Sequence, residues 1–186
     1  MSILIGDVEL LEGKNVSLRV VEKEDLSLGL QWANSLDYMG EFQFIPQMSK
    51  ADIEKMFESE GSETKTFLIE KKDGTKIGNI GHRKVGKAQE ISYNVLPTER
   101  RKGYCSEAAE IMVDYLFLSK DIVRIQAHAN IENVASQKVL EKTGFKKEGI
   151  ERKRDFVRGK WTDSYVYSIL REEWKEPKIL ARAILT

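Results

Sequence analysis

The chain has 186 residues, 41% of them hydrophobic, and its 30 basic residues balance its 30 acidic ones. This length suits one hydrophobic core, and the balanced charge excludes attraction of the whole protein to nucleic acid or to an anionic membrane. One cysteine, Cys105, excludes an intrachain disulfide, and two histidines leave little material for a zinc site. No apolar run reaches the roughly 20 residues of a membrane span. We therefore expect one cytoplasmic domain over residues 1–186, with no metal and no membrane partner.

The N-terminal half predicts a strand, two helices and three more strands. Helical spacing of Leu26, Leu30 and Ala33 indicates the first helix, and Ser49 is a suitable N-cap for the second. Alternating apolar residues and the turn at 72–75 indicate the strands. The predicted elements are the strand 16–21, the helices 24–34 and 50–60, and the strands 66–70, 76–82 and 90–95.

The C-terminal half predicts a helix, a strand, a second helix and two strands, followed by a helical tail. Apolar residues recur at helical spacing over 106–118, and Asn133 and Gly144 suit the two ends of the next helix. The predicted elements are the helix 106–118, the strand 122–128, the helix after Asn133, the strands 147–157 and 161–170, and the tail 171–186. This order predicts an α/β fold with helices on a mixed sheet.

A basic turn joins the strand 90–95 to the helix 106–118. It contains Arg100, Arg101, Lys102 and Gly103. The first turn of a helix has unpaired N–H groups and a partial positive charge, and a glycine lets the backbone approach an anion closely. The segment therefore predicts a phosphate site. A solvated basic turn is the alternative that this motif alone leaves open.

Two ordered motifs give the chain a family resemblance. The run Arg100-x-x-Gly103-x-Cys105 is similar to the (Gln/Arg)-x-x-Gly-x-(Gly/Ala) signature of GNAT acetyltransferases, although Cys105 departs from it. The segment from Asn133 to Gly149, with Ser136 and Gly144-Phe145, looks like the second signature of RimJ/RimL-type members. The resemblance covers residues 14–170. It implies a GNAT-like, mostly antiparallel sheet of about seven strands, about four flanking helices and a C-terminal helix.

The resemblance also implies that acetyl-coenzyme A is the cosubstrate. The strand 90–95 is then expected to carry a bulge and to diverge from the strand 122–128, so that pantetheine lies between them. Amides from Arg101 to Cys105 would hold the pyrophosphate, main-chain groups near Tyr93, Asn94 and Val95 would pair with pantetheine, and a strand N–H would polarise the thioester. The implied cofactor-binding residues are Tyr93, Asn94, Val95, Arg100, Arg101, Lys102, Gly103, Tyr104, Cys105, Ser106 and Asn133.

The implied catalytic residues differ from those of many GNAT enzymes. Leu140 occupies the position of the usual tyrosine acid, so the resemblance makes Ser136 the candidate acid for the departing thiolate. Asp155 is the candidate base and Glu90 the alternative, although either carboxylate could be a solvated or ion-paired charge. For Cys105 we expect a space-filling role, with a pKa lowered by the helix end.

These features predict a direct transfer of acetyl to a primary amine in a ternary complex. Loss of the ammonium proton at pH 7 costs about 1 kcal/mol for an α-amine but about 4.6 kcal/mol for a lysine. Because the candidate bases of this chain are weak, the favoured acceptor is the α-amine of a protein or peptide N-terminus, of the type that ribosomal-protein-alanine acetyltransferases modify. The alternatives are a small-molecule amine (an amino sugar, polyamine or amino acid) and a catalytically silent coenzyme A-binding module.

Three further features leave questions open. The basic residues between Lys146 and Lys160 could contact nucleic acid, but Glu148, Glu151 and Asp155 interrupt them, so a solvated strand face is favoured. Acceptor choice is expected to depend on residues 36–56 and 155–161. The tail 171–186 could pack on its own sheet or on a second subunit, so both a monomer and a homodimer remain possible.

Overall fold

One seven-stranded sheet organises the computed structural model, which describes residues 11–45 and 47–179. The strand order is β1-β2-β3-β4-β5-β7-β6, and every neighbouring pair is antiparallel except β4 and β5. The strands are β1 (Val16–Val20), β2 (Thr64–Lys71), β3 (Lys76–Val85), β4 (Ala88–Val95), β5 (Arg124–Asn130), β6 (Lys146–Val157) and β7 (Lys160–Leu170). The mixed, mostly antiparallel sheet is therefore confirmed.

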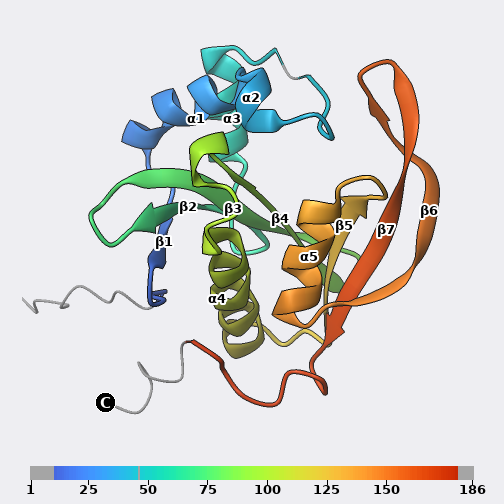
Figure 1. Cartoon of the computed structure of the whole chain (residues 1–186). Helices are drawn as coiled ribbons and strands as arrows, with labels where there is room; N and C mark the ends of the chain where they lie inside the picture. Colours follow the sequence, from blue (N-terminus) through green and yellow to red (C-terminus); the bar gives the residue numbers. More distant parts are fainter. Residues whose placement is uncertain (1–10, 46, 180–186) are drawn as a thin grey trace, which may run out of the picture.

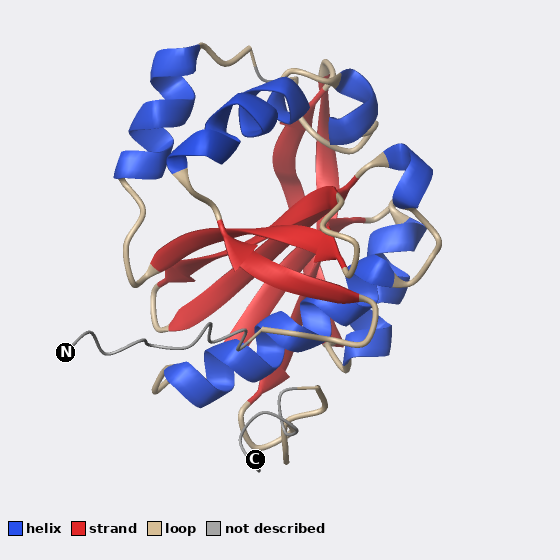
Figure 2. Ribbon diagram, turned by 90° about the vertical axis from the view of Figure 1, so that its left-hand side faces the viewer, coloured by secondary structure: helices blue, strands red, loops and turns tan. Residues whose placement is uncertain are grey.

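Helices cover both faces of this sheet (Figures 1 and 2). One face carries α1 (Leu26–Ala33), α2 (Leu36–Met39) and α3 (Lys50–Glu58), and the other carries α4 (Tyr104–Ser119) and α5 (Val134–Thr143). Two 3₁₀ turns, η1 (Lys23–Asp25) and η2 (Pro97–Glu99), precede α1 and α4. The sequence did not predict α2, because one turn is too short to show periodicity. Within the described ranges, no helix has the length and apolar character needed to cross a membrane.

The main core lies between the sheet and the pair α4 and α5. Along β5 the residues Ile125, Ala127 and Ala129 are buried beneath these helices, while Gln126 and His128 point to the opposite face. A smaller apolar cluster of Trp32, Tyr38 and Leu68 packs on that opposite face. The two faces therefore differ: one is closed by long helices, and the other is partly polar.

The parallel pair β4 and β5 stays together over only two residue pairs, Gln89–Ile125 and Glu90–Gln126. Beyond Glu90 the two strands diverge, and we call this divergence the fork. The predicted divergence is present, but the predicted bulge is wrong, because β3 and β4 keep one register along their whole length. At the end of this pairing β3 and β4 approach so closely that Gly78 is required, since a Cβ there would lie 2.2 Å from the carbonyl oxygen of Asn94.

The predicted C-terminal helix is wrong over residues 171–179, which form turns. Pro177 has no N–H to donate to a helix. The segment is instead tied to α4, where Asp114 accepts hydrogen bonds from Trp174 Nε1 and from the Ile179 amide, both at 2.8 Å. These residues thus pack on their own chain. Residues 1–10, 46 and 180–186, which the domain and tail predictions also included, lie outside the described residues.

We predict that Trp174→Phe lowers the free energy of unfolding by about 1.5–3 kcal/mol, because it removes one hydrogen bond to a buried charged group. The ring contact with Phe117, 5.4 Å between centroids, should remain. Urea denaturation measures the change. Trp161→Phe is the matched control, since Trp161 is 60% exposed on the β6–β7 hairpin. An equal loss of unfolding free energy in both variants would contradict a contribution of residues 171–179 to the stability of the fold.

Candidate functional site

The turn before α4 has the backbone of an anion site. Gly103, with φ of 87°, is the N-cap of α4, and no side chain caps the helix. A Cβ placed on Gly103 would meet no atom within 4 Å. Arg101 also has a positive φ, 65°, which is uncommon for a residue other than glycine. The positive end of this 16-residue helix therefore has no side-chain cap, and the space beside its N-cap glycine is open.

The basic side chains of this turn are arranged differently from the expectation. Arg100 donates to the carbonyl oxygens of Asp37 (2.9 Å), Tyr38 (3.0 Å) and Val95 (3.3 Å), so its guanidinium holds α2 against the end of β4. Lys102 pairs with Glu99 at 3.1 Å. Arg100 is thus a structural clamp, and the predicted phosphate contact from its side chain is not what this geometry favours.

The end of β4 is also held from the α2 side. The hydroxyl of Tyr38 donates to Asn79 Oδ1 at 2.6 Å and to the carbonyl oxygen of Asn94 at 3.3 Å. The carbonyl groups of Asn94 and Val95, predicted to contact pantetheine, therefore already accept bonds within the protein.

A hydroxyl pair joins β4 to α5 on the helix-covered side of the fork. Tyr93 OH lies 3.1 Å from Ser136 Oγ and 3.3 Å from the carbonyl oxygen of the same serine. Burial raises the pKa of Tyr93 well above its usual range, so its phenol stays protonated. Asn133 caps α5 through Oδ1, which accepts from the Ser136 amide at 3.0 Å. The cap fixes the position of Ser136.

Cys105, at the start of α4, has the opposite shift from the one predicted. Burial raises the pKa of its thiol to about 12, and the charge of Arg100 offsets only part of this effect. Partly buried and packed against the main core, Cys105 has a protonated, unreactive thiol. Burial of the thiol therefore decides its pKa, and the start of α4 does not lower it as predicted.

An ion network occupies the other side of the fork, where β4 and β5 last pair. Glu90 accepts from Arg83 Nη2 at 2.6 Å and from Gln126 Nε2 at 3.1 Å. His128 Nδ1 lies 3.1 Å from Glu90 Oε2, although its direction makes this an electrostatic contact without a hydrogen bond. On the far side of the ring, His128 Nε2 lies 3.4 Å from Glu151 Oε1.

This network keeps Glu90 ionised. Burial opposes its charge, but contacts with His128, Arg83 and Gln126 outweigh burial and lower the pKa of Glu90 to about 2. Arg154 adds a further positive charge, 4.0 Å from Glu90, and also pairs with Glu151. A carboxylate held this strongly in its charged form is a poor proton acceptor.

Asp155, the other candidate base, lies farther along the hairpin. It is opposite Thr162, two residues beyond Ser164, where the pairing of β7 with β5 ends. Its side chain is 52% exposed and contacts Arg154 Nε at 3.4 Å and Ser164 Oγ at 3.3 Å. The acid candidate Ser136 and the base candidates Glu90 and Asp155 thus belong to opposite faces of the sheet.

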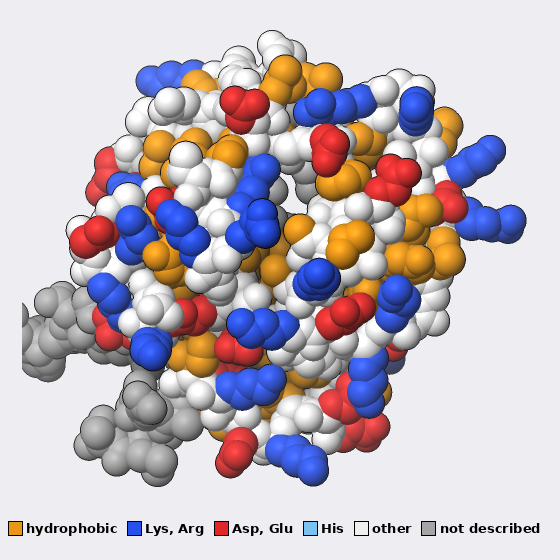
Figure 3. All heavy atoms as spheres, viewed as in Figure 1, with side chains coloured by type: hydrophobic (Ala, Val, Ile, Leu, Met, Phe, Trp, Pro, Cys, Tyr) orange, Lys and Arg blue, Asp and Glu red, His pale blue; other side chains and the backbone are white. Residues whose placement is uncertain are grey.

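The open end of this second face is bridged by the β6–β7 hairpin. Arg158, near the hairpin tip, donates to the carbonyl oxygen of Gly40 directly after α2, at 2.9 Å. Together with the Arg100 clamp, this contact ties the hairpin, α2 and the end of β4 into an arch. Figure 3 shows the surface hollowed between the start of α4 and the start of α5, with basic side chains on the α4 rim.

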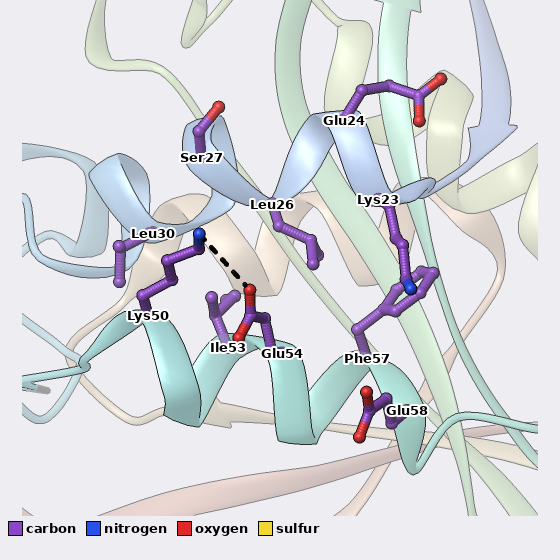
Figure 4. A pocket seen from close by; sticks show the side chains of 10 residues that line it. All are labelled: Lys23, Glu24, Leu26, Ser27, Leu30, Lys50, Ile53, Glu54, Phe57 and Glu58. Carbon is purple, nitrogen blue, oxygen red and sulfur yellow. Dashed lines mark ion pairs between the residues drawn. The ribbon is translucent and has the colours of Figure 1, made fainter.

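A separate surface cavity of about 520 Å³ lies between α1 and α3 (Figure 4). The ion pair of Lys50 and Glu54, 3.7 Å apart, crosses its wall. None of its lining residues comes from β4, β5 or the turn before α4, so it does not communicate with the fork. In the described part of the chain, no group of three or more His, Cys, Asp or Glu residues is placed to hold a metal ion.

The basic residues of β6 and its hairpin are largely engaged within the protein. Lys146 pairs with Glu173, Lys147 lies 3.7 Å from the ring centre of Tyr165, and Arg154 and Arg158 have the partners given above. This arrangement favours the solvated, ion-paired strand over a nucleic-acid surface.

Three side chains of the site were missed from the sequence: the Tyr93 hydroxyl, His128 and Glu151. Strand alternation could have found His128, since it lies on the same face of β5 as Gln126, which pairs with Glu90. Glu151 could not be placed, because the pairing of β6 with β7 shifts register between Glu151 and Asp155.

Comparisons with known proteins agree with this architecture. The family described as acetyltransferase (GNAT) domain matches residues 15–146. An uncharacterized N-acetyltransferase, p20 of Bacillus licheniformis, is 30% identical over 90% of this chain and 99% of its own length. YnaD of Bacillus subtilis, also an uncharacterized N-acetyltransferase, is 32% identical over 76% of this chain and 84% of its own. The crystal structure of spermidine N-acetyltransferase from Vibrio cholerae with CoA and spermine has a TM-score of 0.76 at 21% identity, covering 87% of this chain and 98% of that one.

We predict that Glu90 contributes a pH-dependent part of the stability. Its pKa in the folded protein, about 2, is below its ordinary value, so its contribution is present above about pH 4.5 and is lost as the pH falls toward 2. Glu90→Gln should therefore unfold with a free energy lower by about 1–3 kcal/mol at pH 7, and the gap should close as the pH approaches 2. Denaturation at both pH values measures this.

Glu54→Gln is the control for this prediction, because Glu54 forms only an exposed i,i+4 pair with Lys50. The free energy of unfolding of Glu54→Gln should equal that of the wild type at both pH values. A gap for Glu90→Gln that stays constant with pH would contradict the lowered pKa.

Proposed function

Because the chain belongs to the GNAT acetyltransferase family, we propose that this N-acetyltransferase moves acetyl from acetyl-CoA to the primary amine of a small molecule at the fork. GNAT acetyltransferases use acetyl-CoA as the acetyl donor. The proposal adds two points: which groups hold the donor, and which acceptor enters from the other side.

The uncapped start of α4 is the observation that carries the donor site. Its first amides, from Tyr104 to Ser106, have no capping side chain, and no atom lies within 4 Å of a Cβ built on Gly103, which supports a diphosphate site there. Arg101 and Lys102 stand in the same turn and add positive charge. Pantetheine would then follow β4 into the fork, where main-chain groups of Tyr93, Asn94 and Val95 would pair with it.

In this proposal Ser136 protonates the departing thiolate. It stands in the first turn of α5 on the helix-covered side of the fork, and Tyr93 OH lies 3.1 Å from its hydroxyl. A phenol in that position can donate to Ser136 Oγ and leave the serine proton free for sulfur. This serine at its motif position supports the finer, RimJ/RimL-type assignment. Asn133 would act by capping α5 and holding Ser136 in place.

The arch favours a small acceptor. The contact of Arg158 with Gly40 closes the hairpin over the acceptor side, so a lysine on a folded protein surface could approach only with difficulty. Glu90, Glu151 and Asp155 are already paired with Arg83, Arg154 and His128, which leaves little unpaired negative charge for a second ammonium. We therefore expect a monoamine. The V. cholerae neighbour is a spermidine N-acetyltransferase, which supports a small amine but has a polyamine as its substrate.

A peptide N-terminus is the second candidate. Glu90 is a weak base, and an α-amine loses its proton at pH 7 for about 1 kcal/mol. A flexible chain end is also slender enough to pass beneath the arch. A catalytically silent CoA-binding module stays the alternative of another class; it would bind CoA but acetylate no amine.

We predict that Gly103→Ala weakens CoA binding at least about tenfold, because a methyl group would enter the space in front of the α4 amides at a strained φ. Titration calorimetry with CoA measures the affinity. Gly74→Ala is the matched control: Gly74 has φ of 81° and equally open space, but it lies in the β2–β3 turn. Wild-type protein that gives no heat with CoA would rule out the donor site.

We also predict that Arg158→Ala shifts acceptor preference toward larger amines, because it removes the contact that closes the arch. Release of free CoA thiol is measured with monoamines, polyamines, and peptides with free N-termini. Small monoamines should be the best wild-type acceptors, and the ratio of peptide to monoamine rates should rise in the variant. Arg152→Ala, an exposed arginine of β6, is the control. A wild-type enzyme that acetylates only peptides would favour the second candidate.

A further inference from the structure

The acceptor side of the fork contains one imidazole between two carboxylates from different strands. Glu90 belongs to β4, His128 to β5 and Glu151 to β6. We propose that His128 accepts the proton of the acceptor amine, that Glu90 orients and stabilises its ring, and that Glu151 passes the proton to solvent. This proposal rests on the proposed function.

The position of His128 follows from strand register. Glu90 and Gln126 form the last pair between β4 and β5. Ser92 and His128 are each two residues farther along, so they stand on the same face, on the two opposite arms of the fork. An amine that reaches the thioester from this face must pass between these arms. His128 is therefore the titratable side chain nearest the start of the divergence on β5.

The two ring nitrogens of His128 have different surroundings. Nδ1 is buried and lies 3.1 Å from Oε2 of the charged Glu90 without forming a hydrogen bond, and this negative charge favours the tautomer with its proton on Nδ1. That tautomer leaves the lone pair on Nε2, toward Glu151. The division of roles follows the logic of a carboxylate–histidine pair, in which the acid orients the imidazole and stabilises its protonated form without taking the proton.

Exposure increases along this row of side chains. The side chains of Glu90 and His128 are both 10% exposed, whereas that of Glu151 is 45% exposed. A proton held on Nε2 therefore has one carboxylate oxygen 3.4 Å away that also reaches water. Arg154, paired with Glu151, and Arg83, paired with Glu90, surround the row and keep both carboxylates charged.

The other two carboxylate candidates fit the role less well. Glu90 is held in its charged form by its donors, and Asp155 stands at the far part of the hairpin beyond the end of the β5 pairing. Imidazole is the side chain that ordinarily gains and loses a proton near neutral pH, as a base that acts on an amine must.

The proton count balances in this arrangement. The amine nitrogen forms a C–N bond to the acetyl carbon and loses one proton to His128 Nε2, which releases it through Glu151 to water. The C–S bond breaks, and the thiolate takes one proton on the opposite face from Ser136, which water replaces. One proton leaves and one enters, so an amine and a thioester give an amide and a thiol.

The test compares His128→Gln, His128→Ala and Glu151→Gln with the wild type, using the best amine from the acceptor panel. We expect kcat to fall about 100-fold in the two His128 variants, with CoA affinity unchanged. Added imidazole should restore part of the rate of His128→Ala in proportion to its concentration, which a structural role would not produce. Glu151→Gln should lower kcat less, by about tenfold, since water can replace it.

Glu148→Gln is the matched control for Glu151→Gln, because Glu148 also lies on β6 and pairs with an arginine, Arg124. It should keep the wild-type kcat. Wild-type kcat in His128→Gln would overturn the proposal, as would lost activity in His128→Ala that imidazole does not restore while CoA still binds. A wild-type protein that binds CoA but acetylates no amine would instead contradict the proposed function itself.

Discussion

Backbone N–H and C=O groups need partners, and beyond Glu90 and Gln126 the strands β4 and β5 no longer supply them to one another. This loss of pairing in the middle of a sheet is the constraint on which the rest of the site depends. It exposes main-chain polar groups in an otherwise closed sheet, and it does so where α4 and α5 both begin (Figure 1). A ligand that offers amide groups, as pantetheine does, can satisfy the edges that the strands leave open.

The two faces of the fork have different electrostatic character. On the helix-covered face, the amides at the start of α4 and the neutral pair of Tyr93 and Ser136 suit a phosphate and a departing sulfur. On the other face, carboxylates, arginines and an imidazole form a network that can move a proton. The proposed acyl transfer uses both environments, and the divergence of β4 from β5 brings them to one place in the sheet.

Arginine side chains tie separate elements of this site together. Arg100 binds the carbonyl oxygens of α2 from the β4 end, and Arg158 binds the carbonyl oxygen of Gly40 from the hairpin. A guanidinium can satisfy several carbonyl groups at once because its N–H groups form a rigid fork. The short helix α2 therefore connects the end of β4 with the β6–β7 hairpin, and in the proposed function it limits the size of the acceptor.

The sequence by itself determined the order of the strands and of α1, α3, α4 and α5, together with the caps Ser49, Asn133 and Gly144, because periodicity and capping are local properties. The family resemblance implied the seven-stranded sheet. The tertiary structure decided the partners of the charged side chains. Arg100 became a clamp, and the thiol of Cys105 became a weaker acid through burial. Tail residues 171–179 formed turns, because their hydrogen bonds go to Asp114. Burial and long-range contacts set these outcomes, and neither can be read from neighbours in the chain.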